Sequence, residues 1–302
     1  MANAVKKKDR TSLILVFIAL IATVILLATI AGGLILYNKT NNADINEEVM
    51  EHRMDGEDSW EEEELEEEDT SPASVLHLLP TNPYDELDFQ YEGWFLKNTA
   101  VDCLSGIDVS SYQGEIDWHQ VAEAGVDFAI IRLGYRGYES GKLAEDKFAR
   151  QNLEGAAEAG IQLGVYFFSQ ALNPNEAREE ARFVLDMIDP YEISMPVVFD
   201  WEHVSSETAR TNNMNPYAAT DCAKAFLEVI EEAGYWPMMY FNSFQSRKLF
   251  YLDRLMQYDF WLALYSDRMD FPYKVDMWQY TCTGTIPGVI GDVDVNVLFL
   301  DD

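Results

Sequence analysis

The 302-residue chain contains few of the residues on which several common kinds of site depend. It has three cysteines and four histidines and no Cys-x-x-Cys pair, which argues against a structural zinc site. Lysine and arginine number 21 against 53 acidic residues, so the basic footprint of a nucleic-acid-binding protein is absent. The chain also lacks a Gly-x-Ser-x-Gly elbow, a His-Glu-x-x-His sequence and a glycine-rich phosphate loop. A serine hydrolase, a zinc protease and a phosphate-loop enzyme are therefore unsupported. The sequence does not fix whether any two of the three cysteines, Cys103, Cys222 and Cys282, are paired, and their odd number leaves at least one free or intermolecular.

One long run without charge stands near the start of the chain. Residues 13–37 are enough to cross the ~30 Å hydrocarbon core of a membrane as an α-helix. A cleaved signal peptide has a shorter apolar core, roughly 7 to 15 residues, so we interpret residues 12–37 as an uncleaved signal anchor. Four basic residues lie within residues 1–11, whereas Lys39 is the only base close behind the run. The positive-inside rule then predicts a single-pass cell-membrane protein, with residues 1–11 in the cytoplasm and everything after the anchor outside.

Residues 38–100 follow as a polar and then strongly acidic segment. Fifteen acids lie between positions 44 and 69, against the single base Arg53. Such a stretch buries too little apolar surface to offset its ordering entropy, so we expect a disordered, self-repelling extracytoplasmic linker. An acidic helix that docks on a basic partner is the alternative.

Residues 101–302 alternate regularly between strand-like and helix-like patterns. The spacing predicts five strands, each followed by a helix with one apolar face, and then three strands without long helices between them. This order predicts an α/β protein with a TIM-like barrel, reduced at its end. The predicted strands are 104–109, 128–133, 162–168, 196–202, 237–241, 260–265, 275–280 and 289–299, and the predicted helices are 118–124, 146–159, 174–188, 216–233 and 244–252.

The fourth predicted strand ends in two carboxylates. Residues 195–203 read Met-Pro-Val-Val-Phe-Asp-Trp-Glu-His, and alternation along a strand places Asp200 and Glu202 on one face with Trp201 on the other. Two neighbouring carboxylates disfavour a second charge, so one of them is expected to keep its proton to higher pH and serve as an acid. This arrangement suits acid-assisted cleavage of a glycosidic bond. A strand end whose acids only meet solvent or cap the next helix is the alternative.

Further acids and aromatic residues fall near the ends of other predicted strands. In a barrel of this type, reactive groups sit where the strands finish, so the acids are expected to converge. Aromatic and amide side chains beside carboxylates suit the apolar faces and polar rims of sugar rings. The candidate acids are Asp108, Asp200, Glu202 and Asp294, and the candidate sugar ligands are Tyr166, Tyr240, Trp278 and Gln279.

Four separated motifs resemble those of the family 25 glycoside hydrolases, the lysozymes that cut bacterial peptidoglycan. The first reads Gly-Ile-Asp-Val-Ser-Ser-Tyr-Gln-Gly-Glu-Ile-Asp-Trp over residues 106–118, followed by Phe-Ala-Ile-Ile-Arg over 128–132. The others are Phe-Asp-Trp-Glu at 199–202, Trp-Gln-Tyr at 278–280 and Gly-Asp-Val-Asp-Val-Asn at 291–296. The resemblance implies a flattened barrel of five β/α units and three final strands. It also implies hydrolysis of the β-1,4 bond between N-acetylmuramic acid and N-acetylglucosamine, without a cofactor.

The resemblance also implies roles for the candidate residues. Glu202 matches the proton donor, and the three aspartates named above match the acidic cleft. Asp200 would orient the acetamido group or stabilise positive charge, Asp294 would hold the charge balance or position the nucleophile, and Asp108 would support the pair. Either a carboxylate or the acetamido oxygen of the substrate would be the nucleophile. Phe167 departs from the pattern, because many relatives have histidine there.

Two further interpretations remain beside the enzyme. The first is a non-catalytic module that binds the wall, and the second is a subunit of an envelope complex that opens a path through it with protein partners. A calcium loop at 292–296 is disfavoured, because position six is Val297 rather than glycine, and no metal site is expected.

Overall fold

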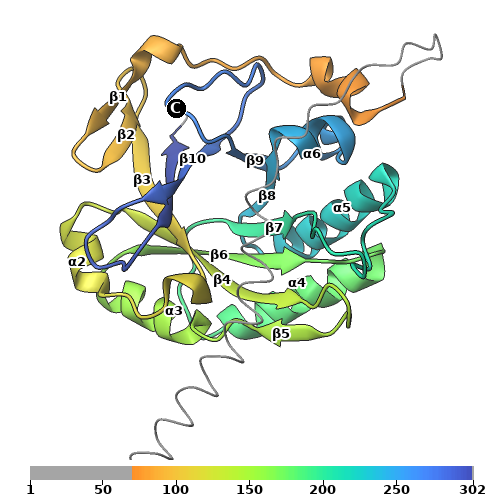
Figure 1. Cartoon of the computed structure of the whole chain (residues 1–302), viewed down its shortest axis with the longest axis horizontal. Helices are drawn as coiled ribbons and strands as arrows, with labels where there is room; N and C mark the ends of the chain where they lie inside the picture. Colours follow the sequence, from red (N-terminus) through yellow and green to blue (C-terminus); the bar gives the residue numbers. More distant parts are fainter. Residues whose placement is uncertain (1–69, 301–302) are drawn as a thin grey trace, which may run out of the picture. The chain divides into compact units, whose positions relative to one another are not determined.

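The computed structural model describes residues 70–300, and this part of the chain folds around an eight-stranded barrel (Figure 1). The strands follow one another in the ring order β3, β11, β10, β9, β8, β7, β6, β4, and pairing of β4 with β3 closes the ring. Neighbouring strands are parallel except around β11, which is antiparallel to both β10 and β3. A short strand, β5, extends the sheet outside the ring as an antiparallel partner of β4. The bounds are β3 Cys103–Val109, β4 Phe128–Arg136, β5 Leu143–Glu145, β6 Gln162–Ser169, β7 Val197–Trp201, β8 Pro237–Asn242, β9 Asp259–Ala263, β10 Met277–Gly284 and β11 Val293–Phe299.

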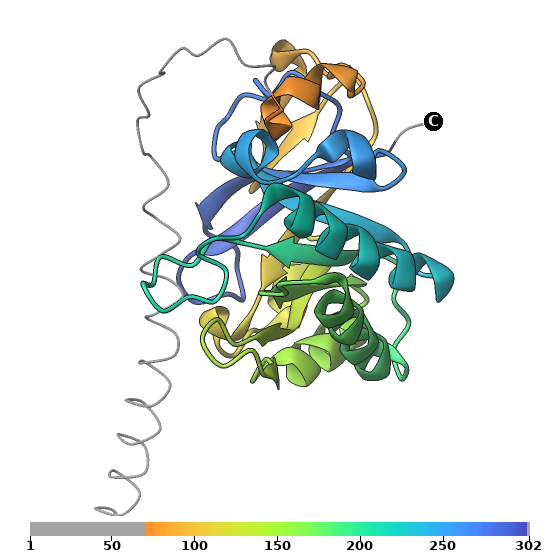
Figure 2. The same cartoon turned by 90° about the vertical axis from the view of Figure 1, so that its right-hand side faces the viewer.

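In chain order, a helix follows each of the first five strands of the ring, β3, β4, β6, β7 and β8, and the short strand β5 lies between β4 and its helix. Asparagine caps begin the two long helices: the Asn173 and Asn215 side chains each accept from backbone N–H groups of the first turn, and proline follows each cap. Figure 2 shows these two helices side by side on the outside of the sheet, α4 in green and α5 in teal. The bounds are α2 Trp118–Glu123, α3 Ala149–Glu158, α4 Pro174–Ile188, α5 Pro216–Glu232 and α6 Ser243–Lys248.

The predicted order of five strand–helix units and three final strands is confirmed. Boundaries differ by up to a few residues. The last two strands begin at Met277 and Val293 rather than at 275 and 289. The fifth predicted helix, 244–252, is shorter, because α6 ends at Lys248 and a separate 3₁₀ helix, Leu252–Leu255, follows it.

Alternation along the strands divides the apolar side chains between two cores. Phe128, Trp261 and Met277 belong to the core inside the barrel, whereas their neighbours along the strands pack outward against the helices. The backbone of β3 passes close to the inner core at Gly106. A Cβ atom there would lie 2.2 Å from Cζ of Phe128, so only glycine fits at this position.

The prediction that residues 38–100 form one disordered linker is wrong from residue 70 onward. Residues 70–100 contain two 3₁₀ helices and a hairpin, and they pack on the barrel. Tyr84 stacks on Phe299 with ring centroids 3.9 Å apart, and Phe89 meets Trp278 edge-on at 5.2 Å. The apolar side chains of this segment therefore complete the outer core. The bounds are η1 Pro72–Leu78, η2 Glu86–Asp88, β1 Phe89–Glu92 and β2 Phe95–Asn98.

The described residues leave the membrane prediction untested. Among residues 70–300, no helix has the length and apolar character needed to cross a membrane. The predicted tail, anchor and acidic stretch lie in residues 1–69, outside the described part of the chain.

Candidate active site

All four predicted acids come to the same end of the barrel. Asp108 lies near the end of β3 and Asp200 near the end of β7, while antiparallel β11 brings Asp294 to that end from its own beginning. Asp108 and Asp294 are direct partners in the antiparallel register. These three aspartates are buried on the inner face, whereas Glu202, one residue beyond β7, is half-buried. This is the end at which barrels of parallel strands carry their reactive groups.

A hydrogen-bond network from two neighbouring strands holds Asp108. Its Oδ2 accepts from Nε2 of Gln279 at 2.7 Å and from Nδ2 of Asn296 at 2.9 Å. The Oε1 atom of Gln279 accepts from the hydroxyls of Tyr240 and Tyr265, both at 3.1 Å. Oδ1 of Asn296 accepts from Nε1 of Trp261 at 2.9 Å. Because each amide has its oxygen and nitrogen bonded to different partners, both orientations are fixed, and so is the Asp108 carboxylate.

A buried cation stands at the same end of the barrel. Arg132 on β4 is paired in register with Tyr166 on β6 and forms an ion pair with Asp146 at 2.7 Å. It also donates to Ser111, just beyond β3, and lies over the Tyr112 ring at 5.2 Å. Burial lowers the pKa of Arg132, but Tyr166, Asp146 and Tyr112 together raise it more, and the net pKa is above its usual value. Arg132 therefore stays charged and ties the loop after Asp108 to β4.

Two of the four predicted sugar ligands have other roles. Gln279 is fully buried, and its amide is occupied by Asp108 and the two tyrosines, so it positions an acid rather than a glycan. Trp278 faces the outer core, where it is fully buried and donates Nε1–H to the carbonyl of Leu264. The prediction for Trp278 is therefore wrong, and the burial of Gln279 disfavours the one made for that residue. Tyr166 and Tyr240 do lie on the inner face at the acidic end, and their contact with a sugar stays a prediction.

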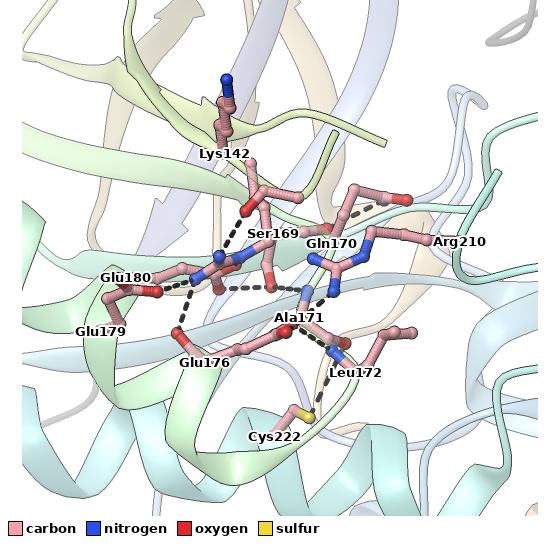
Figure 3. Close-up of polar contacts among 12 residues, drawn as sticks. Lys142, Ser169, Gln170, Ala171, Leu172, Glu176, Glu179, Glu180, Arg210 and Cys222 are labelled. Atoms are coloured by element: carbon pink, nitrogen blue, oxygen red, sulfur yellow. Dashed lines mark hydrogen bonds and ion pairs between the residues drawn. The ribbon is translucent and has the colours of Figure 1, made fainter. Parts of the chain in front are cut away.

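A second polar cluster is buried where β6 ends (Figure 3). Glu180 of α4 is fully buried, accepting from Nε of Arg136 and from Oγ of Ser169, both at 2.6 Å. Arg136 also donates to Glu179 and to the carbonyls of Gly141 and Glu176. Burial raises the pKa of Glu180 to about 7, although Ser169 and Arg136 act in the opposite direction. The cluster joins the ends of β4 and β6 to the first turns of α4.

Three polar residues at this end of the barrel were not predicted as site residues: Arg132, Asn296 and Gln170. Arg132 and Asn296 had a usable signal, because each is a polar residue in a strand, at an even spacing from inward-facing neighbours. Gln170 had none. It is fully buried just after β6, and apart from the adjacent Ser169 carbonyl its partners, Glu202 and Thr211, lie more than thirty residues away.

Residues 292–296 do not form a calcium loop. Most of this stretch belongs to β11, as its apolar alternation indicated. Within residues 70–300, no group of three or more histidine, cysteine or acidic side chains is arranged to hold a metal ion.

Comparison with known proteins agrees with this geometry. Residues 107–289 match the family described as Glycosyl hydrolases family 25, which is more than half of the chain. The chain belongs to this family. The matched residues contain Asp108, Asp200 and Glu202, while Asp294 follows shortly after them. The barrel is thus a glycoside hydrolase of the lysozyme type.

The chain is also similar to a curated lysozyme and to several solved structures. Lysozyme M1 of Streptomyces globisporus is 28% identical over 213 residues, a match that covers 64% of this chain and 67% of the length of lysozyme M1. The modular autolysin LytC of Streptococcus pneumoniae has a TM-score of 0.56 and 28% identity over 65% of this chain. That match spans only 47% of LytC, which was also solved with a synthetic peptidoglycan ligand. A family 25 glycosyl hydrolase of Bacillus anthracis shares the fold, with 22% identity, a TM-score of 0.56, and coverage of 70% of this chain and 95% of its own.

Proposed function

We propose that this chain hydrolyses the β-1,4 bond between N-acetylmuramic acid and N-acetylglucosamine in peptidoglycan. The observation that carries the proposal is the meeting of four acids from β3, β7 and β11 at one end of the barrel. Membership of glycosyl hydrolase family 25 and the peptidoglycan ligand of LytC support peptidoglycan as the substrate class. Two carboxyl groups that flank a glycosidic bond are the usual means of cleaving it.

The burial of the four acids supports a division of roles among them. Glu202 is the only one of the four that is half-buried rather than buried, so it is the acid placed to protonate a leaving oxygen. Asp200, two residues earlier on the same strand face, orients the acetamido group or stabilises positive charge. Asp294 positions the nucleophile, and Asp108, held by Gln279 and Asn296, supports Asp294 across the register.

The test is the chemistry of the fragments released from peptidoglycan of known composition. The full chain, incubated in heavy-oxygen water, should release fragments whose reducing end is N-acetylmuramic acid and whose new hydroxyl contains the heavy oxygen. Mass spectrometry after borohydride reduction distinguishes this end from N-acetylglucosamine. Reducing N-acetylglucosamine, unlabelled anhydro sugars or free peptides as the only products would refute the assigned bond.

The location proposed for this activity is the outer face of the cell membrane. The uncharged run at 13–37 and the bases before it motivate an anchor with a cytoplasmic N-terminus. The full chain should then sediment with membranes after a carbonate wash, and protease added to intact spheroplasts should remove the barrel. A chain that begins at residue 38 is the matched control, and the carbonate wash should leave it in the supernatant rather than in the membrane pellet. Full-length chain in the carbonate supernatant would contradict the anchor.

A further inference from the structure

Two buried glutamines hold the backbone at the proposed proton donor. Nε2 of Gln170 donates to the carbonyl of Glu202 at 2.8 Å, and Nε2 of Gln245 donates to the carbonyl of Trp201. Gln170 is fully buried and Gln245 is 2% exposed. Consecutive carbonyls around Glu202 are therefore each bound by a side chain from a different element.

The two glutamines act where the backbone ladders on both sides of β7 end. The register of β6 with β7 stops at Ser169 opposite Trp201, and that of β7 with β8 stops at Asp200 opposite Tyr240. Successive carbonyls of a strand point to opposite sides, and buried carbonyls need partners. Gln170, one residue beyond β6, binds the carbonyl of Glu202 from the β6 side. Gln245, in the first turn of α6, binds the carbonyl of Trp201 from the β8 side. The two side chains thus provide hydrogen-bond donors to β7 beyond the point where β6 and β8 stop pairing with it.

Second contacts fix each amide with its nitrogen toward β7. Oε1 of Gln170 accepts from Oγ1 of Thr211 at 2.7 Å. Oε1 of Gln245 accepts from the backbone N–H of Asn242 at 2.8 Å, within the capping box that starts α6. A flip of Gln245 would lose both of its bonds, and a flip of Gln170 would set its oxygen against the carbonyls of Ser169 and Glu202. Each amide therefore presents a donor to the backbone of residues 201 and 202.

Gln170 also ties the far part of the same loop to β6. Thr211 belongs to residues 202–215, which connect β7 with α5, so one side chain binds this loop at residues 202 and 211. Next to Thr211, Arg210 forms an ion pair with Glu176 of α4 at 2.8 Å, as Figure 3 shows. Ser169, the residue before Gln170, donates its hydroxyl to the Glu180 carboxylate. Gln170 and Gln245 together form a clamp on the backbone of residues 201 and 202. Its Gln170 side is linked through Ser169 and Arg210 to the buried cluster of α4.

We propose that Gln170 and Gln245 are positioning residues that fix Glu202 for proton transfer. The inference rests on the proposed role of Glu202. Neither amide touches the substrate; each acts through the backbone of residues 201 and 202. Misplacement of a reacting group by about 1 Å can cost a hundredfold in rate, so the rigidity of this backbone controls turnover.

The test uses the full chain and variants on the Gln170 side of the clamp. Thr211→Val removes the hydroxyl that orients Gln170, and Thr211→Ser keeps it. We expect Thr211→Val and Gln170→Met to lower kcat on soluble glycan strands by about ten- to a hundredfold per folded molecule. KM should stay within about twofold, because Glu202 acts in the transition state rather than in substrate binding. Thr211→Ser should return kcat to near the wild-type value.

The matched control is Asn212→Ala in the same loop. Asn212 donates to the carbonyls of Ser206 and Glu207, and none of its bonds reaches residues 201 or 202. Its loss should leave kcat unchanged. Backbone hydrogen exchange of residues 202–211 gives a second measurement, independent of activity, and it should accelerate in Thr211→Val and Gln170→Met and return in Thr211→Ser.

The outcomes separate the inference from the proposed function. Faster exchange together with a lowered kcat supports the clamp. An unchanged kcat per folded molecule in an active protein overturns it, as does a serine variant that is as slow as the valine variant. If the wild-type chain cleaves no glycan, the proposed function fails, and hydrogen exchange alone decides the clamp: unchanged exchange in both variants overturns it.

Discussion

Replacing Glu202 by glutamine is expected to lower glycan turnover by about a hundred- to ten-thousandfold. Glutamine keeps the shape of the side chain but cannot donate the proton that a leaving oxygen needs. The backbone of residue 202 is held through its carbonyl, which the substitution leaves in place. The free energy of unfolding should therefore stay close to that of the wild type. The measurement is the rate of appearance of new reducing ends from purified peptidoglycan.

Glu207 provides the matched control for this substitution. It lies five residues later in the same loop and is exposed, so Glu207→Gln removes the same charge without touching the acidic end of the barrel. Its rate should match the wild type. Sedimentation with insoluble peptidoglycan should be retained by both variants, which separates loss of chemistry from loss of binding. Full activity of Glu202→Gln would remove this residue from the proposed mechanism.

The barrel was predictable from sequence because its signals are local. The third predicted strand, 162–168, is β6 and spans Gln162–Ser169. The fourth predicted helix, 216–233, is α5 and spans Pro216–Glu232. Apolar periodicity and the proline and asparagine at the helix starts are properties of a short window. The acids could be placed for a similar reason, since alternation and strand ends fix the face and the level of Asp108 and Asp200.

The errors arose where contacts between distant segments decide the structure. The acidic run at 61–69 suggested that the whole segment to residue 100 was solvated, yet Leu76, Phe95 and Leu96 are buried. These side chains pack against apolar residues of the barrel that are distant in sequence, and the local composition around residues 70–100 does not reveal such contacts. Trp278 is a different case, because alternation alone places it on the opposite face from Gln279. Only one of these two neighbours could have lined the acidic end.

Replacing Arg136 by methionine is expected to lower the free energy of unfolding by about 3–5 kcal/mol at pH 8. Arg136 is buried, and it is the cation that pairs with the fully buried Glu180. Methionine leaves that carboxylate without its counterion, and two backbone carbonyls lose a donor. The measurement is urea unfolding of the full chain, followed by tryptophan fluorescence.

The cost of Arg136→Met should depend on pH in a defined direction. The pKa of Glu180 is about 7 in the folded protein against an ordinary value of 4.5. A group whose pKa is raised on folding contributes stability below its unfolded pKa, and that contribution is lost as pH rises through the folded pKa. At pH 5 the Glu180 carboxyl is protonated with or without Arg136, whereas at pH 8 the variant must either keep a proton on Glu180 or hold an unpaired buried charge. The variant should therefore lose less stability at pH 5 than at pH 8.

Two further variants separate the charge effect from the loss of packing. Arg150→Met breaks the exposed ion pair with Glu145 and should cost less than about 1 kcal/mol at either pH. Adding Glu180→Met to Arg136→Met removes the stranded carboxylate and should recover part of the stability at pH 8 but little at pH 5, where that carboxyl is already neutral. An equal cost at both pH values would mean that Glu180 has no charge for Arg136 to balance. In that case the arginine would hold the ends of β4 and α4 through its backbone bonds alone, and the double variant would be no more stable than the single one.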